Sequence, residues 1–161
     1  MIEILHRDAR CVAVNKPSGI ATHRGWADDD DALLQLVRDT VGAYVYPVHR
    51  LDRGASGVTL FALDKDAARA FSDAWPGADK RYFAITRGHP PEHLVIDHPI
   101  PRAPGLERVP SKTEIWRRDA FGRWVIIDIA VTNRGDRTPE RVLVLRVKHC
   151  DQRIQIGHCH Q

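Results

Sequence analysis

The sequence predicts a mixed α+β fold within a single domain. Short runs of aliphatic and β-branched residues, bounded by turn residues, are typical of strands, and they alternate along the chain with two stretches whose apolar residues recur at helical spacing. The 161 residues are a single-domain length. Folding of the whole chain would bury about 70% of its surface, which is enough for one hydrophobic core.

The chain opens with a predicted β-hairpin. Strands at 2–5 and 10–15 flank a polar turn at 6–9. Lys16-Pro17-Ser18-Gly19 then ends the second strand, because proline has no amide donor and glycine tolerates a positive φ. A turn of this kind can present Lys16 to a ligand, and a solvated surface lysine fits the pattern equally well.

Two amphipathic helices are predicted. The first is expected to begin at Asp28–Asp31, whose negative charge suits the positive end of a helix and supplies a cap, and to end at Gly42. The second is expected to begin at the capping residue Asp64 and to end at Pro76–Gly77. A helix start is preferred to a metal site at the four aspartates, because nothing else in that segment completes a ligand set.

The remaining elements are predicted to be extended. An extended stretch at 44–48 leads into a loop, and a buried strand follows at 58–63. Residues 81–86 alternate polar and apolar side chains as a strand, with Tyr82 on the same face as Ala84 and Thr86.

The last third of the chain is predicted to hold two strands and a long loop. Residues 89–110 are rich in proline and glycine and are expected to form a surface loop, with one strand-like piece at 95–100. Strands at 111–116 and 124–131 flank a turn at 119–122.

Composition excludes several classes of protein. No uncharged apolar run approaches the roughly 20 residues that span a bilayer, and the N-terminus lacks the pattern of a secretory signal, so a cytoplasmic location without a membrane segment is expected. Three scattered cysteines give no disulfide framework, and Cys11 is expected to be a small buried hydrophobe. The net charge of +3 permits nucleic-acid binding without establishing it.

The stretch from His49 to Val58 carries the candidate chemistry. It sets Asp52 between Arg50 and Arg53, just ahead of the apolar run. Flanking arginines favour the ionised carboxylate, which can act as a nucleophile. On the residues alone, a simple turn into the following strand is the preferred interpretation, because aspartate and glycine are common in turns.

Three motifs in order resemble the RluA group of RNA pseudouridine synthases. His-Arg-Leu-Asp-Arg-x-x-Ser-Gly at 49–57 is similar to the active-site signature of that group. Upstream, 12–24 resembles its Asn-Lys-Pro-x-Gly segment, and downstream 80–88 resembles its Lys-x-Tyr strand. The likeness covers residues 1–118, which we expect to be the N-terminal portion of a catalytic domain.

The resemblance implies a fold, a reaction and a set of site residues. It implies a central antiparallel sheet flanked by helices, and isomerisation of uridine to pseudouridine in tRNA without a cofactor or metal. Asp52 would be the catalytic carboxylate, and Tyr82 would stack on the uracil and act as, or assist, the base. The residues expected to bind substrate or RNA are His49, Arg50, Arg53, Lys16 and Lys80. Arg102 and Arg108 could meet RNA in the long loop, and no protein partner is indicated.

The resemblance fades over 119–161. The group carries a later Thr-Gly-Arg-x-His-Gln-x-Arg segment whose first arginine pairs with the catalytic aspartate, and Thr132-Asn133-Arg134 is the nearest fragment here. We therefore expect a truncated or altered C-terminal segment of the same domain, with a predicted strand at 142–147. One alternative function is a catalytically weak or inactive RNA-binding fragment.

Another alternative is a metal-binding module in the tail. Residues of types that bind zinc cluster there, although their spacing fits no usual zinc motif. They are His149, Cys150, His158, Cys159 and His160.

Overall fold

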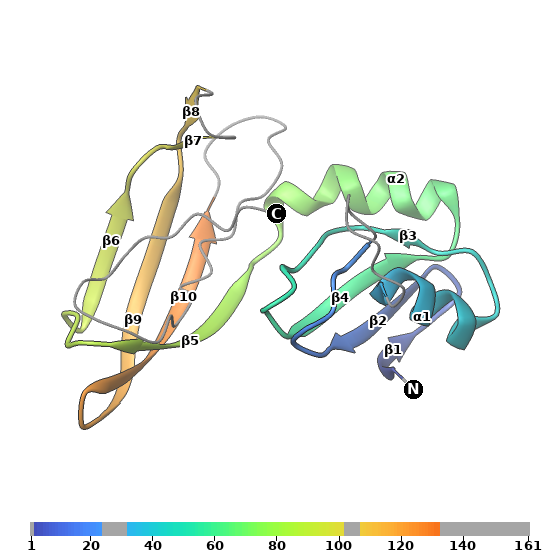
Figure 1. Ribbon diagram of the computed structural model, residues 1–161. Helices are drawn as coiled ribbons and strands as arrows, with labels where there is room; N and C mark the ends of the chain where they lie inside the picture. Colours follow the sequence, from blue (N-terminus) through green and yellow to red (C-terminus); the bar gives the residue numbers. More distant parts are fainter. Residues whose placement is uncertain (1, 24–31, 102–106, 133–161) are drawn as a thin grey trace. The chain divides into compact units, whose positions relative to one another are not determined.

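A computed structural model describes residues 2–23, 32–101 and 107–132 of the chain. The chain folds as two compact units, one up to Gly77 and the other from Ala78 onward, and each unit is described by itself (Figure 1). Both helices belong to the first unit, and each unit has its own four-stranded antiparallel sheet. The predicted α+β class with antiparallel pairing is confirmed, and the strands divide between two sheets.

The first sheet has the strand order β1-β2-β4-β3. Its strands are β1 (Glu3–Arg7), β2 (Cys11–Lys16), β3 (Tyr46–Pro47) and β4 (Gly57–Ala62). The predicted hairpin is confirmed, with both strands beginning one residue later than expected. Asp8 shapes the turn between them, because its Oδ1 accepts hydrogen bonds from the amides of Arg10 and Cys11, both at 2.7 Å. Cys11 is buried, as predicted, and burial raises the pKa of its thiol.

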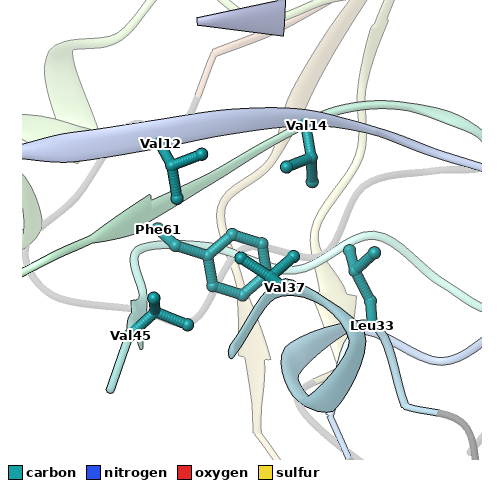
Figure 2. Close-up of a cluster of buried hydrophobic side chains, with 6 residues drawn as sticks. All are labelled: Val12, Val14, Leu33, Val37, Val45 and Phe61. Atoms are coloured by element: carbon teal, nitrogen blue, oxygen red, sulfur yellow. The ribbon is translucent and has the colours of Figure 1, made fainter. Parts of the chain in front are cut away.

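Helix α1 (Leu33–Val41) closes the core of the first unit. Figure 2 shows its Leu33 and Val37 facing buried side chains of the sheet and of the segment before β3. The full cluster is Val12, Val14, Leu33, Val37, Val45 and Phe61, each with no exposed surface. Burying one such side chain contributes about 1.5–3 kcal/mol. The helix ends at Gly42, whose φ of 72° is the left-handed conformation predicted there.

The predicted aspartate cap of α1 is wrong. The N-cap is Ala32, which makes no side-chain capping bond, and Asp28–Asp31 lie outside the described residues. Backbone carbonyls take the place of a side chain: the Ala21 oxygen accepts from the amide of Leu33 at 2.9 Å, and the Thr22 oxygen accepts from Leu34 at 3.0 Å. The start of the helix is therefore tied to the segment that follows the turn at 17–20.

Helix α2 (Lys65–Ala74) begins and ends as predicted. The side chain of Asp64 caps it by accepting a hydrogen bond from the amide of Ala67 at 2.7 Å. A short 3-10 turn, η1 (Trp75–Gly77), ends it. The helix contacts β3 and β4, so it belongs to the scaffold of the first sheet.

The second sheet has the strand order β5-β10-β9-β6. Its strands are β5 (Arg81–Arg87), β6 (His93–Asp97), β9 (Lys112–Phe121) and β10 (Trp124–Thr132), and a separate short hairpin joins β7 (Ile100–Pro101) to β8 (Arg108–Val109). The side chains on one face form a core cluster with Ile115, Val125, Ile127, Ile129 and Val131 at its centre. The strand at 81–86 is confirmed, with Tyr82 and Ala84 packed against that cluster.

The predicted surface loop at 89–110 is wrong over much of its length, because the segment contains β6, β7 and β8. The strand-like piece predicted at 95–100 corresponds to the end of β6 and the start of β7. Leu94 and Ile96 alternate with exposed neighbours and pack on the second core, and β6 pairs with β9. The turn between β9 and β10 is also tighter than the turn predicted at 119–122. Gly122, at a φ of 59°, and Arg123 join β9 directly to β10. The predicted strand at 142–147 lies outside the described residues.

Candidate active site

The candidate nucleophile lies on the loop that joins β3 to β4. Asp52 is half-buried, and its carbonyl accepts a hydrogen bond from the amide of Ala55 at 3.0 Å, which closes a tight turn. The neighbouring residues Arg50 and Arg53 are exposed. The loop therefore presents one carboxylate between two solvent-accessible cations, as the sequence predicts.

Lys16 lies beneath this loop rather than at the surface. Its side chain is fully buried, so the interpretation of Lys16 as a solvated surface charge is wrong. The ammonium donates to the carbonyl oxygens of Pro17, Arg53 and Ala55 at 3.1, 3.3 and 2.7 Å. Two of these acceptors, on Arg53 and Ala55, follow Asp52 in the same loop, so the lysine fixes the backbone that carries the carboxylate.

The turn at 17–20 adds further bonds to the same loop. The amide of Gly19 donates to the Arg53 oxygen at 2.7 Å, and the Arg53 guanidinium donates back to the Gly19 oxygen at 3.3 Å. The Ser18 hydroxyl donates to the Gly54 oxygen at 2.9 Å. Gly19 has a φ of 99°, which a residue with a side chain rarely adopts. The Asn-Lys-Pro-x-Gly segment and the aspartate loop thus form one hydrogen-bonded unit.

Thr22 is a site residue that the sequence analysis did not single out. Its buried hydroxyl donates to the Leu51 oxygen at 2.8 Å and accepts from the Leu51 amide at 3.0 Å. Both backbone groups of the residue before Asp52 are therefore held by one side chain. The only signal in the sequence is the position of Thr22 inside the upstream motif, because a lone threonine in a loop is otherwise unremarkable.

His49 anchors the other end of the loop. Its Nε2 accepts a hydrogen bond from the amide of Leu60 at 3.1 Å, and its ring stacks on Trp75 with centroids 4.2 Å apart. Because Nε2 accepts, the ring proton of this tautomer is on Nδ1. This arrangement supports the expectation that His49 positions the loop, and it joins β4 to η1.

Positive charge surrounds the carboxylate. Burial lowers the pKa of Lys16, while the nearby negative charge of Asp52 opposes that shift by favouring the ammonium form. Burial also lowers the pKa of His23, and the positive charge of Arg50 adds to this effect. The site therefore combines an ammonium below the loop with guanidinium groups beside it.

The remaining predicted site residues lie in the second unit. Tyr82 is partly buried on the core face of β5, and Lys80 precedes that strand with a partly exposed side chain. The structure thus brings Lys16, His49, Arg50 and Arg53 together around Asp52. The approach of Tyr82 to Asp52 stays a prediction, as do the RNA contacts of Lys80. The cysteine and histidine tail lies outside the described residues, as does Arg102, and Arg108 is in β8.

Replacing Thr22 by valine tests the bond between Thr22 and Leu51. Valine keeps the shape of threonine but leaves two buried backbone groups without a partner, so we expect Thr22→Val to lower the free energy of unfolding by about 1–3 kcal/mol. Urea unfolding followed by tryptophan fluorescence measures this. Thr40→Val is the matched control: Thr40 is exposed, and its hydroxyl bonds only to the Leu36 carbonyl of its own helix. Equal effects of the two substitutions would contradict the account.

Comparison with protein families identifies one match. The family model described as RNA pseudouridylate synthase matches residues 10–150.

None of the helices within the described residues is long and apolar enough to cross a membrane.

Two bacterial relatives are similar to this chain in sequence. The chain is 43% identical over 103 residues to tRNA pseudouridine synthase C of Haemophilus ducreyi, covering 62% of this chain and 42% of the relative. It is 45% identical over 104 residues to tRNA pseudouridine synthase C of Pectobacterium carotovorum subsp. carotovorum, covering 62% and 28%. The chain therefore spans less than half the length of these relatives.

Two solved human structures share the fold. Human RNA Pseudouridylate Synthase Domain Containing 4 superposes with a TM-score of 0.65 at 26% identity, covering 80% of this chain and 58% of that one. Human RNA Pseudouridylate Synthase Domain Containing 1 superposes with a TM-score of 0.69 at 22% identity, covering 83% and 61%, and supports the fold alone.

Proposed function

Since this chain belongs to the RNA pseudouridylate synthase family, we propose that it isomerises uridine to pseudouridine in tRNA, with Asp52 as the catalytic carboxylate. The match of the family model over residues 10–150 carries this proposal. The loop geometry supports it, because Lys16 and Thr22 hold the backbone on both sides of Asp52. Residues 1–118 are then the N-terminal portion of the catalytic domain, and 119–161 is a divergent segment of the same domain.

The reaction exchanges one bond to the ribose for another. The C1′–N1 glycosidic bond breaks, the uracil rotates, and a C1′–C5 bond forms. C5 loses a proton and N1 gains one. Atoms and electrons balance without an oxidant or reductant. Asp52 acts either by attacking the ribose C1′ or the uracil C6, or by stabilising the positive charge that develops at C1′. These routes stay open alternatives.

The neighbouring residues act on the RNA and on the loop. Arg50 and Arg53 are exposed, so RNA phosphates can approach them, while His49 and Lys16 position the loop. Lys80 contributes a further positive charge. A uridine in a stem must leave the helix before it can react, which costs a few kcal/mol that these basic contacts offset.

We propose that the modified nucleotide is uridine 65 of the tRNA. This assignment rests on the resemblance to tRNA pseudouridine synthase C. A tRNA substrate also favours a cytoplasmic location. The second candidate function is a weak or inactive RNA-binding fragment, and the departure of Thr132-Asn133-Arg134 from the family's Thr-Gly-Arg segment favours it. Both candidates share the basic surface around Asp52.

Release of tritium from tRNA labelled at uracil C5 tests the function, because that hydrogen leaves when C5 joins C1′. We expect release by the 161-residue chain, and faster release by a version extended with the missing arginine segment. Equal rates would show that the segment is not needed. No release by a folded chain, with release by the extended version, would favour the inactive fragment. No release by either version would refute the proposed function.

The role of Tyr82 is tested by separating its ring from its hydroxyl. We expect Tyr82→Phe to keep the stacking on uracil and the packing on the second core, and to lose the proton transfer. Its kcat should therefore fall by about 10²-fold while KM is unchanged. Tyr44→Phe is the control, because Tyr44 is an exposed tyrosine outside the proposed site. Full activity of Tyr82→Phe would eliminate the proton-transfer role.

A further inference from the structure

One face of the second sheet carries a row of side chains that the proposed reaction does not use. Phe83, Asp128, Trp116 and His93 are direct cross-strand partners on β5, β10, β9 and β6. Partners in register project to the same face, so these four form one row, called here the aromatic row. Tyr82, the neighbour of Phe83, points to the opposite face and packs in the core.

The aromatic row is exposed to solvent at Phe83. Phe83 is 77% exposed, which is unusual for a phenylalanine in the middle of a strand, and Trp116 is half-buried. The strand spacing of about 4.8 Å sets Phe83 and Trp116 roughly 10 Å apart, with Asp128 between them. Ile85 and Val95 are also exposed, at 47% and 41%.

A hollow with cationic and aromatic walls lies over the same row. Its volume is about 650 Å³, and its lining includes Trp116, Asp128, Glu92 and the arginines Arg81, Arg117 and Arg118. Arg81 also pairs with Asp79 and Arg117 with Glu92, and both of these carboxylates are exposed. The Arg81 guanidinium lies 5.8 Å from the centre of the Trp116 ring, and the His93 ring stacks on the same tryptophan at 5.4 Å. Guanidinium groups beside aromatic rings suit phosphates next to flat bases.

Asp128 supplies an acceptor at the centre of the row. The residue is only 6% exposed, its Oδ2 accepts from the Nε of Arg118, and its buried Oδ1 has no hydrogen-bond partner in the described part of the chain. An unpaired buried oxygen is costly, so a ligand with N–H donors would be stabilised there. The Arg118 side chain is 63% exposed, which leaves it room to swing toward a phosphate and uncover the carboxylate.

We propose that this face binds a single-stranded segment of the RNA substrate. Bases stack on Phe83 and Trp116, the base between them donates an exocyclic amino group to Asp128, and Arg81 and Arg118 contact phosphates. The proposal rests on the proposed function only for the choice of RNA as the ligand. A protein helix would need a donor side chain opposite Asp128 and carboxylates opposite the arginines, whereas RNA carries a phosphate on every nucleotide and an amino group on three of its four bases.

Fluorescence anisotropy with a labelled cytidine oligomer, about 12 nucleotides long to match the site size of single-strand binders, tests the stacking. We expect Phe83→Ala in the full chain to weaken binding roughly tenfold, because one base–aromatic stack is lost, and Phe83→Tyr to bind normally. Phe121→Ala is the matched control: Phe121 is 48% exposed in the same sheet but lies outside the row. Equal affinities of Phe83→Ala and Phe121→Ala would overturn the proposal.

A uridine oligomer of the same length tests the role of Asp128, because uracil has no exocyclic amino group. We expect tighter binding of the cytidine oligomer, and loss of that preference in Asp128→Asn. A preference unchanged by Asp128→Asn would overturn the assignment of this carboxylate, as would equal binding of the two oligomers by the unmodified chain.

Two further measurements separate RNA binding at this face from turnover and from self-association. Oligomer binding is measured without turnover, so its result does not depend on whether the chain isomerises uridine. Asp52→Asn should therefore bind the oligomers normally. Sedimentation without RNA tests a second copy of the chain as the occupant. A self-association that Phe83→Ala abolishes, with unchanged oligomer affinity, would refute RNA binding at this face.

Discussion

Asp52→Asn is expected to abolish isomerisation while leaving the fold and the binding of tRNA intact. Asparagine is nearly the same shape as aspartate but is neither a competent nucleophile nor a negative charge at C1′. Loss of a nucleophile commonly costs a factor of about 10³ or more in kcat, so turnover should fall below detection. Tritium release and tRNA affinity, measured on the same preparation, give the two readouts.

The control for this substitution is Asp73→Asn. Asp73 is an exposed carboxylate on α2, so its replacement changes the net charge equally without touching the loop. Its turnover should match that of the unmodified chain. If Asp52→Asn instead kept its turnover, the chain would use another group, and the motif at 49–57 would be a simple turn. If it lost tRNA binding along with turnover, the carboxylate would be needed for the structure of the loop.

Lys16→Met is expected to produce the largest loss of stability. Methionine keeps the apolar stem in its buried position but removes three hydrogen bonds to carbonyl oxygens, two of which follow Asp52 in its loop. Relief of the desolvation of the ammonium offsets part of this loss. We expect the free energy of unfolding to fall by about 2–4 kcal/mol, measured by urea denaturation.

The same substitution separates a positioning role from direct RNA contact. If Lys16 positions the loop, Lys16→Met lowers kcat and leaves the salt dependence of tRNA binding unchanged. If its ammonium contacts a phosphate, the slope of log affinity against log salt falls by about one. Lys65→Met is the control, because Lys65 is an exposed lysine at the start of α2. A stability loss no larger than that of Lys65→Met would contradict the burial of Lys16.

Local patterns predicted most elements of the fold. The hairpin, both helices and the strand at 81–86 follow from periodicity and from Asp64 and Gly42, whose roles depend on neighbours within a few residues. Only residues 95–97 of β6 were predicted to be extended, because the whole strand is stabilised by pairing with β9, about 20 residues further along the chain. The start of α1 was misassigned because backbone carbonyls of 21–22 satisfy its first amides, and no side-chain pattern records such a partner.

The sequence could predict the reactive group of the candidate site, but it could not predict the hydrogen bonds that hold the loop around that group. The motif at 49–57 locates Asp52, and the upstream motif locates Lys16. The sequence could not show that Lys16 is buried, because a lysine is usually exposed. Its three partners are backbone carbonyls, which every type of residue carries, so no sequence pattern identifies them. Thr22 was missed for the same reason, since its partners are the backbone groups of Leu51.

Mapping of pseudouridine in tRNA treated with the protein is the most direct test of the central claim. Carbodiimide modification followed by primer extension locates each pseudouridine in a transcript that begins with none. The account predicts a single new pseudouridine, at uridine 65, formed by the unmodified chain and absent after treatment with Asp52→Asn. Formation of the same pseudouridine by Asp52→Asn, or of none by the unmodified and the extended chain, would contradict it.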